Sequence, residues 1–519
     1  MNFTAADTIV FIAYFVLVLS VGFGAVLIGK KKQSSKDYFF AGNTLPWWVI
    51  GASVIAANIS AEQFIGMTGS GYAIGLGIAT YEWLGALGLL IIAKFFLPIY
   101  LKNGIYTMPG FLEKRYDSRL RVGLAVFWLL VYWFVNLSSV FYLGALVLQG
   151  FLGLTLMQWI FALAITSALY SVIGGLKAVA YTDVIQVVFL IFGGLMTTFF
   201  AIKAISNSTD IFLGLEMLFD KAPEKFDLIL SKTDPNYKYL PGLGVIFGGL
   251  WVANIAYFGC NQYIIQRSLA AKNINEAQKG MALAAFLKLF IPLIVVLPGI
   301  AAFVLDAGIE KPDEAYPWLL NTFIPSGFKG LAFAALIAAI VSSLSSMVTS
   351  ASTIFTFDIY KPIFIKTVTD SKLVVVGRIM SAVSLIIAVM VAPLLSSLEQ
   401  AFQFIQDFTG MVTPGIVVVF LFGLFWKKAN AQGALWAVIL TIPVSVLLDL
   451  LIDDLPFLDR MGIAFLILSA ILVLISLLKG GKTNNLIKID EGMYKTSTLF
   501  NVASILISAM LGVLYYTFW

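Results

Sequence analysis

Polar side chains that could bind a ligand lie in the middle of long apolar stretches of this chain. Residues 51–67 are apolar at both ends, and the polar members between them are Asn58, Ser60, Glu62 and Gln63. Such groups are costly in hydrocarbon unless they face protein, water or a ligand, so they are functional by default. The tripeptide Ala-Asn-Ile occurs at 57–59 and again at 253–255. Two interrupted apolar segments at matching places in two halves are the best sequence indication of a transporter binding site.

Other apolar stretches carry a second set of polar residues, which contains two chemical groups: serine hydroxyls, and amide or charged side chains. Its members are Glu82, Asn254, Lys288, Ser342, Ser343 and Gln406. Neighbouring serine hydroxyls beside a broken helix supply hard oxygen ligands, which suit a hard cation. Amide and charged groups hydrogen-bond hydroxyls, and the aromatic faces of Tyr81, Tyr257 and Phe402 can cover a sugar ring. Taken together, these residues favour the binding of a cation and a neutral polyol. For any one of them alone, the alternative interpretation is a polar contact between two helices.

The composition indicates a membrane protein around these residues. Of the 519 residues, 60% are hydrophobic and 12% charged, with a mean hydropathy of +0.95, whereas soluble domains carry about a quarter charged residues. The net charge of +5 does not indicate nucleic acid, because the basic residues lie in alternate loops. The lack of histidine and the single cysteine, Cys260, exclude an internal disulfide and Ser-His-Asp triads. No acidic metal motif or catalytic pair marks a membrane face, so we do not expect an enzyme.

The apolar runs predict an all-α integral membrane protein with about fourteen transmembrane helices of about 20 residues each. The expected spans lie near 6–28, 45–68, 74–101, 121–150, 155–175, 180–205, 240–264, 275–305, 326–358, 373–396, 399–426, 431–452, 461–479 and 496–518. With the N-terminus outside, the inside loops hold about 23 of the 33 Lys and Arg residues, as the positive-inside rule requires. We therefore expect a multi-pass protein of the plasma membrane, a bacterial inner membrane, with both termini outside the cytoplasm.

Motifs along almost the whole chain resemble the sodium/solute symporter family, and most of all its bacterial sodium/galactose (sodium/glucose) symporters. The marks include Asp37-Tyr38-Phe39, residues 56–66, Gly69-Ser70-Gly71-Tyr72, Gly174-Gly175-Leu176, Thr182-Asp183, residues 261–267, Val341-Ser342-Ser343 and Phe425-Trp426-Lys427. The resemblance implies an inverted five-plus-five repeat of the leucine-transporter type, with one extra helix before it and three after it. The implied units are 1–44 (extra helix and basic loop), 45–205 (first repeat), 206–239 (extracytoplasmic loop with a short surface helix), 240–428 (second repeat) and 429–519 (three C-terminal helices).

The resemblance also implies the positions of the ligands. Sodium, the co-transported ion, is expected at the carbonyls of Ala56, Ile59 and Ala339 and the hydroxyls of Ser342 and Ser343. The sugar is expected at Gln63, Glu82, Asn254, Lys288 and Gln406, beside Asn58, with Tyr257 stacked on it as the inner gate. The outer gate is expected at Met67, Tyr81 and Phe402, and Asp183 lies where the family is thought to guide sodium toward the cytoplasm. Two positions depart from the galactose pattern, which has a serine in place of Gly85 and a tryptophan in place of Phe258.

The expected function is secondary active transport, in which inward sodium flow drives uptake of a galactose- or glucose-type monosaccharide by alternating access. The expected partners are the sugar, sodium and the lipid bilayer. The motifs specify the family more closely than the solute, so sodium-coupled transport of inositol, sialic acid, proline or a carboxylate is the main alternative. Proton coupling through Glu62, Glu82 or Asp183 and a passive channel are the others.

Overall fold

The computed structural model describes residues 4–27, 34–60, 62–365, 368–397, 401–479, 487–490 and 492–519. Apart from one isolated bridge between Leu45 and Ala271, the regular structure of these residues is helical. The first α-helices are α1 (Ala5–Leu27), α2 (Ser35–Phe40), α3 (Trp47–Asn58), α4 (Thr68–Ala73), α5 (Thr80–Ile91), α6 (Leu97–Lys102), α7 (Met108–Arg115), α8 (Ser118–Val131), α9 (Leu137–Leu152), α10 (Leu156–Ser206) and α11 (Ile211–Lys221). The α-helix α11 is the short helix expected in the loop 206–239.

The remaining helices continue the same pattern. They are α12 (Leu243–Phe247), α13 (Gly249–Ile255), α14 (Gln262–Leu269), α15 (Ile274–Lys288), α16 (Ile291–Val295), α17 (Leu297–Val304), α18 (Ala315–Thr322), α19 (Lys329–Ile354), α20 (Asp370–Val391), α21 (Ala401–Phe425), α22 (Ala431–Ile439), α23 (Thr441–Leu451), α24 (Phe457–Lys479) and α25 (Thr498–Thr517). Short π-helices are η2 (Glu62–Met67), η4 (Ile92–Phe96), η5 (Tyr132–Asn136), η7 (Ala256–Cys260) and η9 (Phe355–Phe364). Short 3-10 helices are η1 (Ala41–Asn43), η3 (Leu76–Ala79), η6 (Pro223–Phe226), η8 (Pro312–Glu314) and η10 (Ala392–Ser397).

Apolar helices occupy the positions of the predicted spans. Within the described ranges, nine helices are long and apolar enough to cross a membrane, and up to 12 if each bent helix pair is one span. The bent pairs are Trp47–Asn58 with Gln63–Ala73, Ile274–Lys288 with Ile291–Val304, and Ala431–Ile439 with Thr441–Leu451. Two shorter apolar helices, Leu156–Leu169 and Gly249–Cys260, lie at the two other expected spans. The prediction of many spans is confirmed, while the count of about fourteen stays a prediction.

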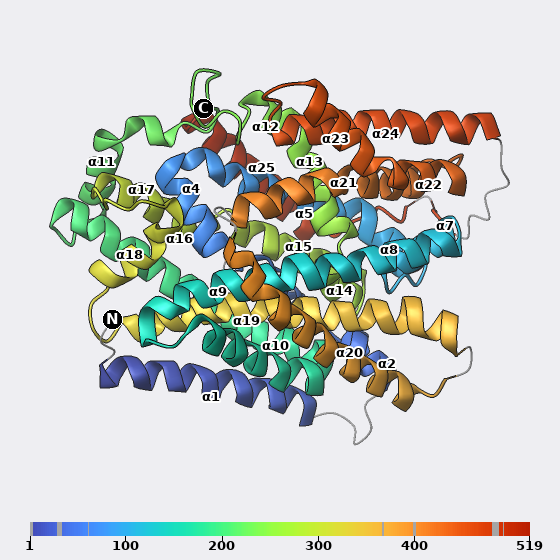
Figure 1. Ribbon diagram of the computed structural model, residues 1–519, viewed down its shortest axis with the longest axis horizontal. Coiled ribbons are helices and arrows are strands. Elements are labelled where there is room, and N and C mark those ends of the chain that lie inside the picture. The colour runs from blue at the N-terminus through green and yellow to red at the C-terminus, as the bar shows by residue number, and fades with distance from the viewer. Residues whose placement is uncertain are drawn as a thin grey trace.

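The helices form one bundle with a buried centre (Figure 1). The most apolar window of the span Lys329–Phe364, which contains α19, is 94% buried, whereas the windows in α1 and α25 are 22% and 17% buried. In Figure 1, α1 lies along one edge of the bundle and α24 along the opposite edge. Exposed apolar helices around a buried one are what a lipid environment requires, because every helix satisfies its own backbone and the outer ones face hydrocarbon.

Two helices lose their hydrogen-bonding ladder where the sequence predicts it. The helix α3 ends at Asn58, Ile59 is extended with φ −85° and ψ 105°, and the chain then bends by 65°. The segment α13–η7 ends at Asn261, which is extended with φ −92° and ψ 125°, before α14 begins at Gln262. Both predicted interruptions are confirmed. Each frees backbone groups in the interior of the bundle, where irregular backbone is tolerated only beside protein or a cavity.

Small residues bring the functional segments together. A Cβ atom at Gly51 of α3 would lie 2.8 Å from the carbonyl oxygen of Gly280 of α15, so these helices cross closely. Likewise, a Cβ atom at Gly193 of α10 would lie 2.5 Å from the Cβ atom of Ala335 of α19. The helix α10 itself is kinked at Gly175, whose φ of 63° favours glycine. The first crossing packs α3 against α15, and the second packs α10 against α19.

Candidate functional site

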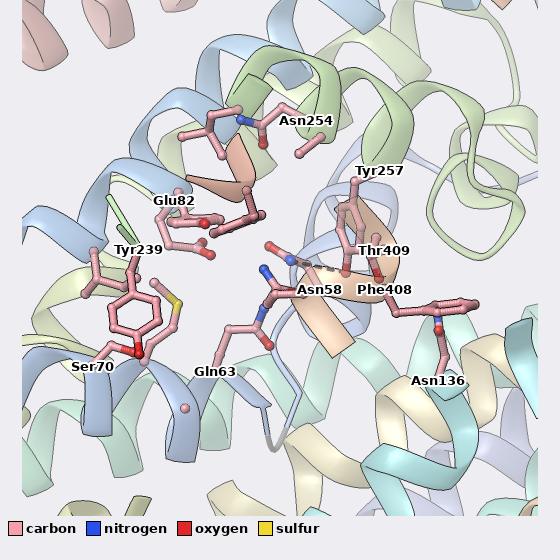
Figure 2. Close-up of a pocket in the computed structure, with 18 of the residues that line it drawn as sticks. Asn58, Gln63, Ser70, Glu82, Asn136, Tyr239, Asn254, Tyr257, Phe408 and Thr409 are labelled. Atoms are coloured by element: carbon pink, nitrogen blue, oxygen red, sulfur yellow. Dashed lines mark hydrogen bonds between the residues drawn. The ribbon is translucent and has the colours of Figure 1, made fainter. Parts of the chain in front are cut away.

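A cavity of about 560 Å³ lies between the two broken helices and helices α5, α15 and α21 (Figure 2). The predicted sugar and gate residues that line it are Asn58, Gln63, Met67, Tyr81, Glu82, Asn254, Tyr257, Lys288 and Gln406. Of the residues predicted for those roles, only Phe402 is left, and its side chain lies outside the described part of the chain. Residues that are about 350 positions apart in the sequence therefore meet around one cavity, whose size is typical of small-molecule sites.

An ion pair on one wall of the cavity links three of these residues. The ammonium group of Lys288 donates to Glu82 Oε2 at 2.5 Å and to Asn58 Oδ1 at 2.6 Å. The side chains of Lys288 and Glu82 are 2% and 4% exposed, so the pair is almost dehydrated. Each group neutralises the other, which lets two charges remain in the interior of the bundle. Asn58, at the last position of α3, thereby connects the broken helix to α5 and α15.

Hydrogen bonds continue from Asn58 to the second broken helix. Asn58 Nδ2 donates to the hydroxyl of Tyr257 at 3.3 Å (Figure 2). The Tyr263 hydroxyl donates to the same oxygen at 2.6 Å. On the other side of the break, the Ser60 N–H and hydroxyl both donate to Gln63 Oε1 at 2.9 Å. In a continued α-helix the Ser60 N–H would donate to the Ala56 carbonyl. Gln63, one of the residues predicted to bind the sugar, thus accepts the hydrogen bonds of the residue that follows the break in α3.

The predicted sodium residues lie together behind this break. Ala56, Ile59, Ala339, Ser342 and Ser343 have no exposed surface. The Ser343 hydroxyl donates to the Ala57 carbonyl at 3.2 Å, which places α19 directly against the end of α3. A hydroxyl oxygen keeps two lone pairs while it donates its hydrogen, so both serine oxygens can still accept a cation. Carbonyl and hydroxyl oxygens without a thiol or imidazole are the ligand set of a hard cation.

Asp183 of α10 lies next to the sodium residues. Its carboxylate accepts hydrogen bonds from the Ser342 hydroxyl at 2.6 Å and from the Ser53 hydroxyl at 2.5 Å. The guanidinium group of Arg267 lies 3.5 Å from Asp183 Oδ2 and donates to Ser53 Oγ at 2.8 Å. Both charged side chains are completely buried. The predicted ion-path residue is therefore closed off from solvent and neutralised by Arg267 in this structure.

Loop residues that sequence reasoning missed also line the cavity. Asn236 and Tyr239 come from the loop after α11, and Lys311 and Asp313 come from the segment around η8. Burial raises the pKa of the Asp313 carboxyl above its usual range. These residues carry no sequence signal, because loops show neither apolar periodicity nor misplaced polarity.

Three more lining residues also escaped the sequence analysis, although two of them carry a signal. They are Asn136, Phe408 and Thr409, all visible in Figure 2. Asn136 and Thr409 are polar residues inside expected apolar spans, so the rule that identified Asn58 applies to them too. Phe408 has no such signal, because an aromatic residue is ordinary in a span.

Comparisons with known sequences agree with this geometry. A sequence profile of the sodium:solute symporter family matches residues 38–441. A sodium/glucose cotransporter from Vibrio parahaemolyticus is 49% identical, over 99% of this chain and 98% of its own length. Human sodium/myo-inositol cotransporter 2 is 34% identical, over 83% of this chain and 68% of its own length. Mouse sodium/glucose cotransporter 1 is 33% identical, over 85% of this chain and 71% of its own length.

Solved structures support the same relationship. The structure of a sodium-coupled sialic acid symporter in a substrate-bound, outward-open state superposes with a TM-score of 0.80 at 25% identity, covering 92% of this chain and 98% of that one. A transporter of the nucleobase-cation-symport-1 family, at 13% identity, shares the fold with a TM-score of 0.56, over 92% of this chain and 99% of its own. The expected all-α fold of the leucine-transporter type is confirmed. The chain belongs to the sodium:solute symporter family, and it is a multi-pass membrane transporter that couples solute to sodium, not an enzyme.

Proposed function

We propose that this transporter uses the inward flow of sodium to take up a hexose of the glucose or galactose type. The observation that carries the proposal is the cavity itself, where Glu82, Lys288, Asn58 and Asn254 converge beside the aromatic ring of Tyr257. Charged and amide groups suit the many hydroxyls of a sugar, and an aromatic face suits the apolar side of its ring. The 49% identical relative named as a sodium/glucose cotransporter supports the same solute.

In this proposal the polar wall of the cavity binds the sugar hydroxyls. Glu82 and Lys288 supply an acceptor and a donor, and Gln63, Asn254 and Gln406 supply amides. Tyr257 stacks on the ring and closes the path below it. A second group of residues, Met67, Tyr81 and Phe402, closes the path above it. Sugar binding shares the contacts of the Lys288–Glu82 pair rather than breaking them, because breaking a buried pair costs several kcal/mol.

Sodium binds at the Ala56, Ile59 and Ala339 carbonyls with the hydroxyls of Ser342 and Ser343. Bound there, the ion fixes the end of α3 against α19. Asp183 then receives the ion on its way to the cytoplasm. The support is the complete burial of all five predicted ligands and the contact between Ser343 and Ala57 at 3.2 Å.

Coupling runs through the break in α3. Asn58 bonds to Lys288, and Gln63 bonds to the backbone of Ser60, so both sugar residues are attached to the segment that sodium orders. The sugar site is complete only when the ion is present, and the coupling free energy is reciprocal. One sodium crossing ~100 mV supplies about 2.3 kcal/mol, and a tenfold gradient adds about 1.4 kcal/mol. The sum, about 3.7 kcal/mol, sustains a sugar gradient of several hundredfold.

The charge bias of the loops supports both termini outside the cytoplasm, and the bacterial relative supports a bacterial inner membrane. On the same basis the inverted repeats are 45–205 and 240–428, separated by the loop 206–239. The extra N-terminal helix and its basic loop are 1–44, and the three C-terminal helices are 429–519. These assignments rest on the charge bias of the loops and on the positions of the two helix breaks.

The alternative solute with a specific observation behind it is a cyclic polyol, since human sodium/myo-inositol cotransporter 2 is 34% identical. Counterflow in proteoliposomes separates the candidates. Vesicles loaded with glucose, galactose, myo-inositol, sialic acid, proline or acetate are tested for sodium-dependent exchange with radiolabelled glucose. We expect exchange with the two hexoses. Sodium-dependent exchange of labelled myo-inositol without exchange of hexose would replace the sugar with the polyol.

A further inference from the structure

The helix α24 comes after both proposed repeats in the chain, yet its first turn reaches the cavity. Phe457, the first residue of α24, lines the cavity together with Gln406 and Thr409 of α21. Arg460 follows Phe457 by three residues, so it lies on the same side of α24. The side chain of Arg460 is only 4% exposed. A charge buried to this extent needs partners of the opposite sign.

Two aspartates from neighbouring helices neutralise Arg460. Arg460 Nη2 donates to Asp407 Oδ1 of α21 at 2.9 Å, and Arg460 Nη1 donates to Asp449 Oδ1 of α23. The side chains of Asp407 and Asp449 are 46% and 50% exposed. The planar guanidinium group presents its donors in a rigid arrangement, so it fixes the direction of both bonds. Arg460 therefore connects α21 and α23 to the start of α24.

One face of α21 lines the cavity. We call residues 406–413 the cavity segment, because its members Gln406 and Thr409 line the cavity at the i, i+3 spacing of one helix face. Pro414 follows the cavity segment directly. Proline has no N–H group, so the carbonyl of Gly410 loses its usual partner in the helix. The position of the cavity segment therefore depends more on its contacts with other helices than on the backbone of α21.

The neighbouring face of the cavity segment packs against α24. A Cβ atom at Gly410 would lie 3.4 Å from Phe457 Cδ2, so the two helices are in van der Waals contact there. Asp407 lies one turn before Gly410 on the same face. Asp407 also precedes the lining residues of that turn and directly follows Gln406 in the chain. The bond from Arg460 to Asp407 thus fixes the end of the cavity segment that carries Gln406.

We propose that Arg460 is a positioning residue for the sugar. Through Asp407 it holds Gln406 and Thr409 at their places in the cavity, without touching the sugar itself. Loss of this contact lets the cavity segment shift, so hexose binding weakens, whereas the proposed sodium ligands on α3 and α19 keep their positions. This inference rests on the proposed hexose uptake, and it adds a residue from outside both repeats to the sugar site.

A matched pair of variants tests this role. Asp407→Ala and Asp449→Ala each remove one carboxylate from Arg460, and the two side chains are similarly exposed. They differ in the helix that is released, because no residue of α23, which is described throughout, lines the cavity. Initial rates of sodium-dependent uptake of labelled glucose and galactose in proteoliposomes give KM and the maximal rate.

We expect Asp407→Ala to raise KM for the transported hexose by about three- to tenfold, between the effects of an exposed and a buried ion pair. The maximal rate should stay unchanged, because only binding is affected. Asp449→Ala should change KM by less than about twofold, because Arg460 keeps its bond to Asp407. Asp407→Glu retains a carboxylate and should restore most of the lost affinity.

Arg460→Gln provides a second, independent variant. It removes both ion pairs, so it should raise KM at least as much as Asp407→Ala. The double variant Asp407→Ala/Arg460→Gln should raise KM no further than Arg460→Gln, because both changes remove the same contact. Melting temperatures with and without sodium, in the absence of sugar, show whether each variant is folded and binds the ion. We expect the shift caused by sodium to equal that of the parent.

The outcomes separate this inference from the proposed function. If the parent takes up neither hexose with sodium, the proposed function is wrong. If the parent transports a hexose but Asp407→Ala and Asp449→Ala change KM equally, or neither changes it, Arg460 serves stability alone and this inference is overturned. A fall in the maximal rate at constant KM would also overturn it. If Asp407→Ala does not fold, a KM for Arg460→Gln equal to that of the parent still contradicts the inference.

Discussion

The buried pair of Lys288 and Glu82 offers the most quantitative test of the site. The two side chains are 2% and 4% exposed, with Lys288 Nζ 2.5 Å from Glu82 Oε2 and 2.6 Å from Asn58 Oδ1. In Lys288→Met the carboxylate of Glu82 stays buried without a counter-ion. Breaking a buried pair in this way costs about 3–5 kcal/mol. Glu82→Gln leaves the ammonium group unpaired and costs a similar amount.

The double variant Glu82→Gln/Lys288→Met removes both charges and is expected to recover most of that loss. Replacing both partners of a buried pair is often neutral, because the dehydration cost disappears with the attraction. The free energy of unfolding is measured by denaturant titration in detergent micelles. Four proteins are compared: the parent, the two single variants and the double variant. The exposed Lys272 provides the control, since Lys272→Met should change this free energy by less than about 0.5 kcal/mol.

Additivity would refute this reasoning. If the loss in the double variant equals the sum of the two single losses, the charges do not compensate each other and the geometry of the wall is wrong. Sodium-dependent hexose uptake gives an independent readout. We expect it to be lost in all three variants, because a donor, an acceptor or both are missing from the sugar site even where the fold recovers.

Four further variants test the ion site, the sugar site and the attachment of the first helix. Ser343→Ala should abolish sodium-stimulated uptake with expression intact, because a ligand of the ion is gone; unchanged dependence on sodium concentration would show that the site is misplaced. Gln63→Ala should weaken hexose binding more than sodium binding in parallel titrations, whereas equal losses would indicate a folding defect. Asp7 accepts the backbone N–H groups of Gly327 and Gly330 at 3.1 and 2.8 Å. Asp7→Ala should therefore lower the free energy of unfolding by about 1–3 kcal/mol, and Asp7→Asn, which keeps an acceptor, by less; equal stability of Asp7→Ala and the parent would contradict this.

Much of the site was predictable because polar groups in hydrocarbon are expensive. Asn58, Glu82 and Lys288 stand out in apolar sequence, and the structure places all three on one wall of the cavity. The break after Asn58 was predictable for the same reason, since a polar run inside a span rarely continues as plain helix. The fold as a whole followed from the number of apolar runs together with motifs along the chain.

The remaining features depend on contacts that no local pattern encodes. Asp183 and Arg267 are 84 positions apart, and their pairing depends on how α10 and α14 pack. Tyr239 reaches the cavity from a loop, where periodicity gives no information. The number of spans was hard to fix because the expected span 275–305 bends by 42° within the bundle.

The central claim is that sodium and hexose occupy adjoining sites created by the two broken helices and move together. The most direct measurement is accumulation of radiolabelled glucose and galactose by proteoliposomes under an inward sodium gradient, with choline replacing sodium in the matched sample. The account predicts accumulation above the external concentration with sodium, its collapse when a sodium ionophore is added, and only slow equilibration with choline. Equal uptake of both hexoses in sodium and in choline would contradict it.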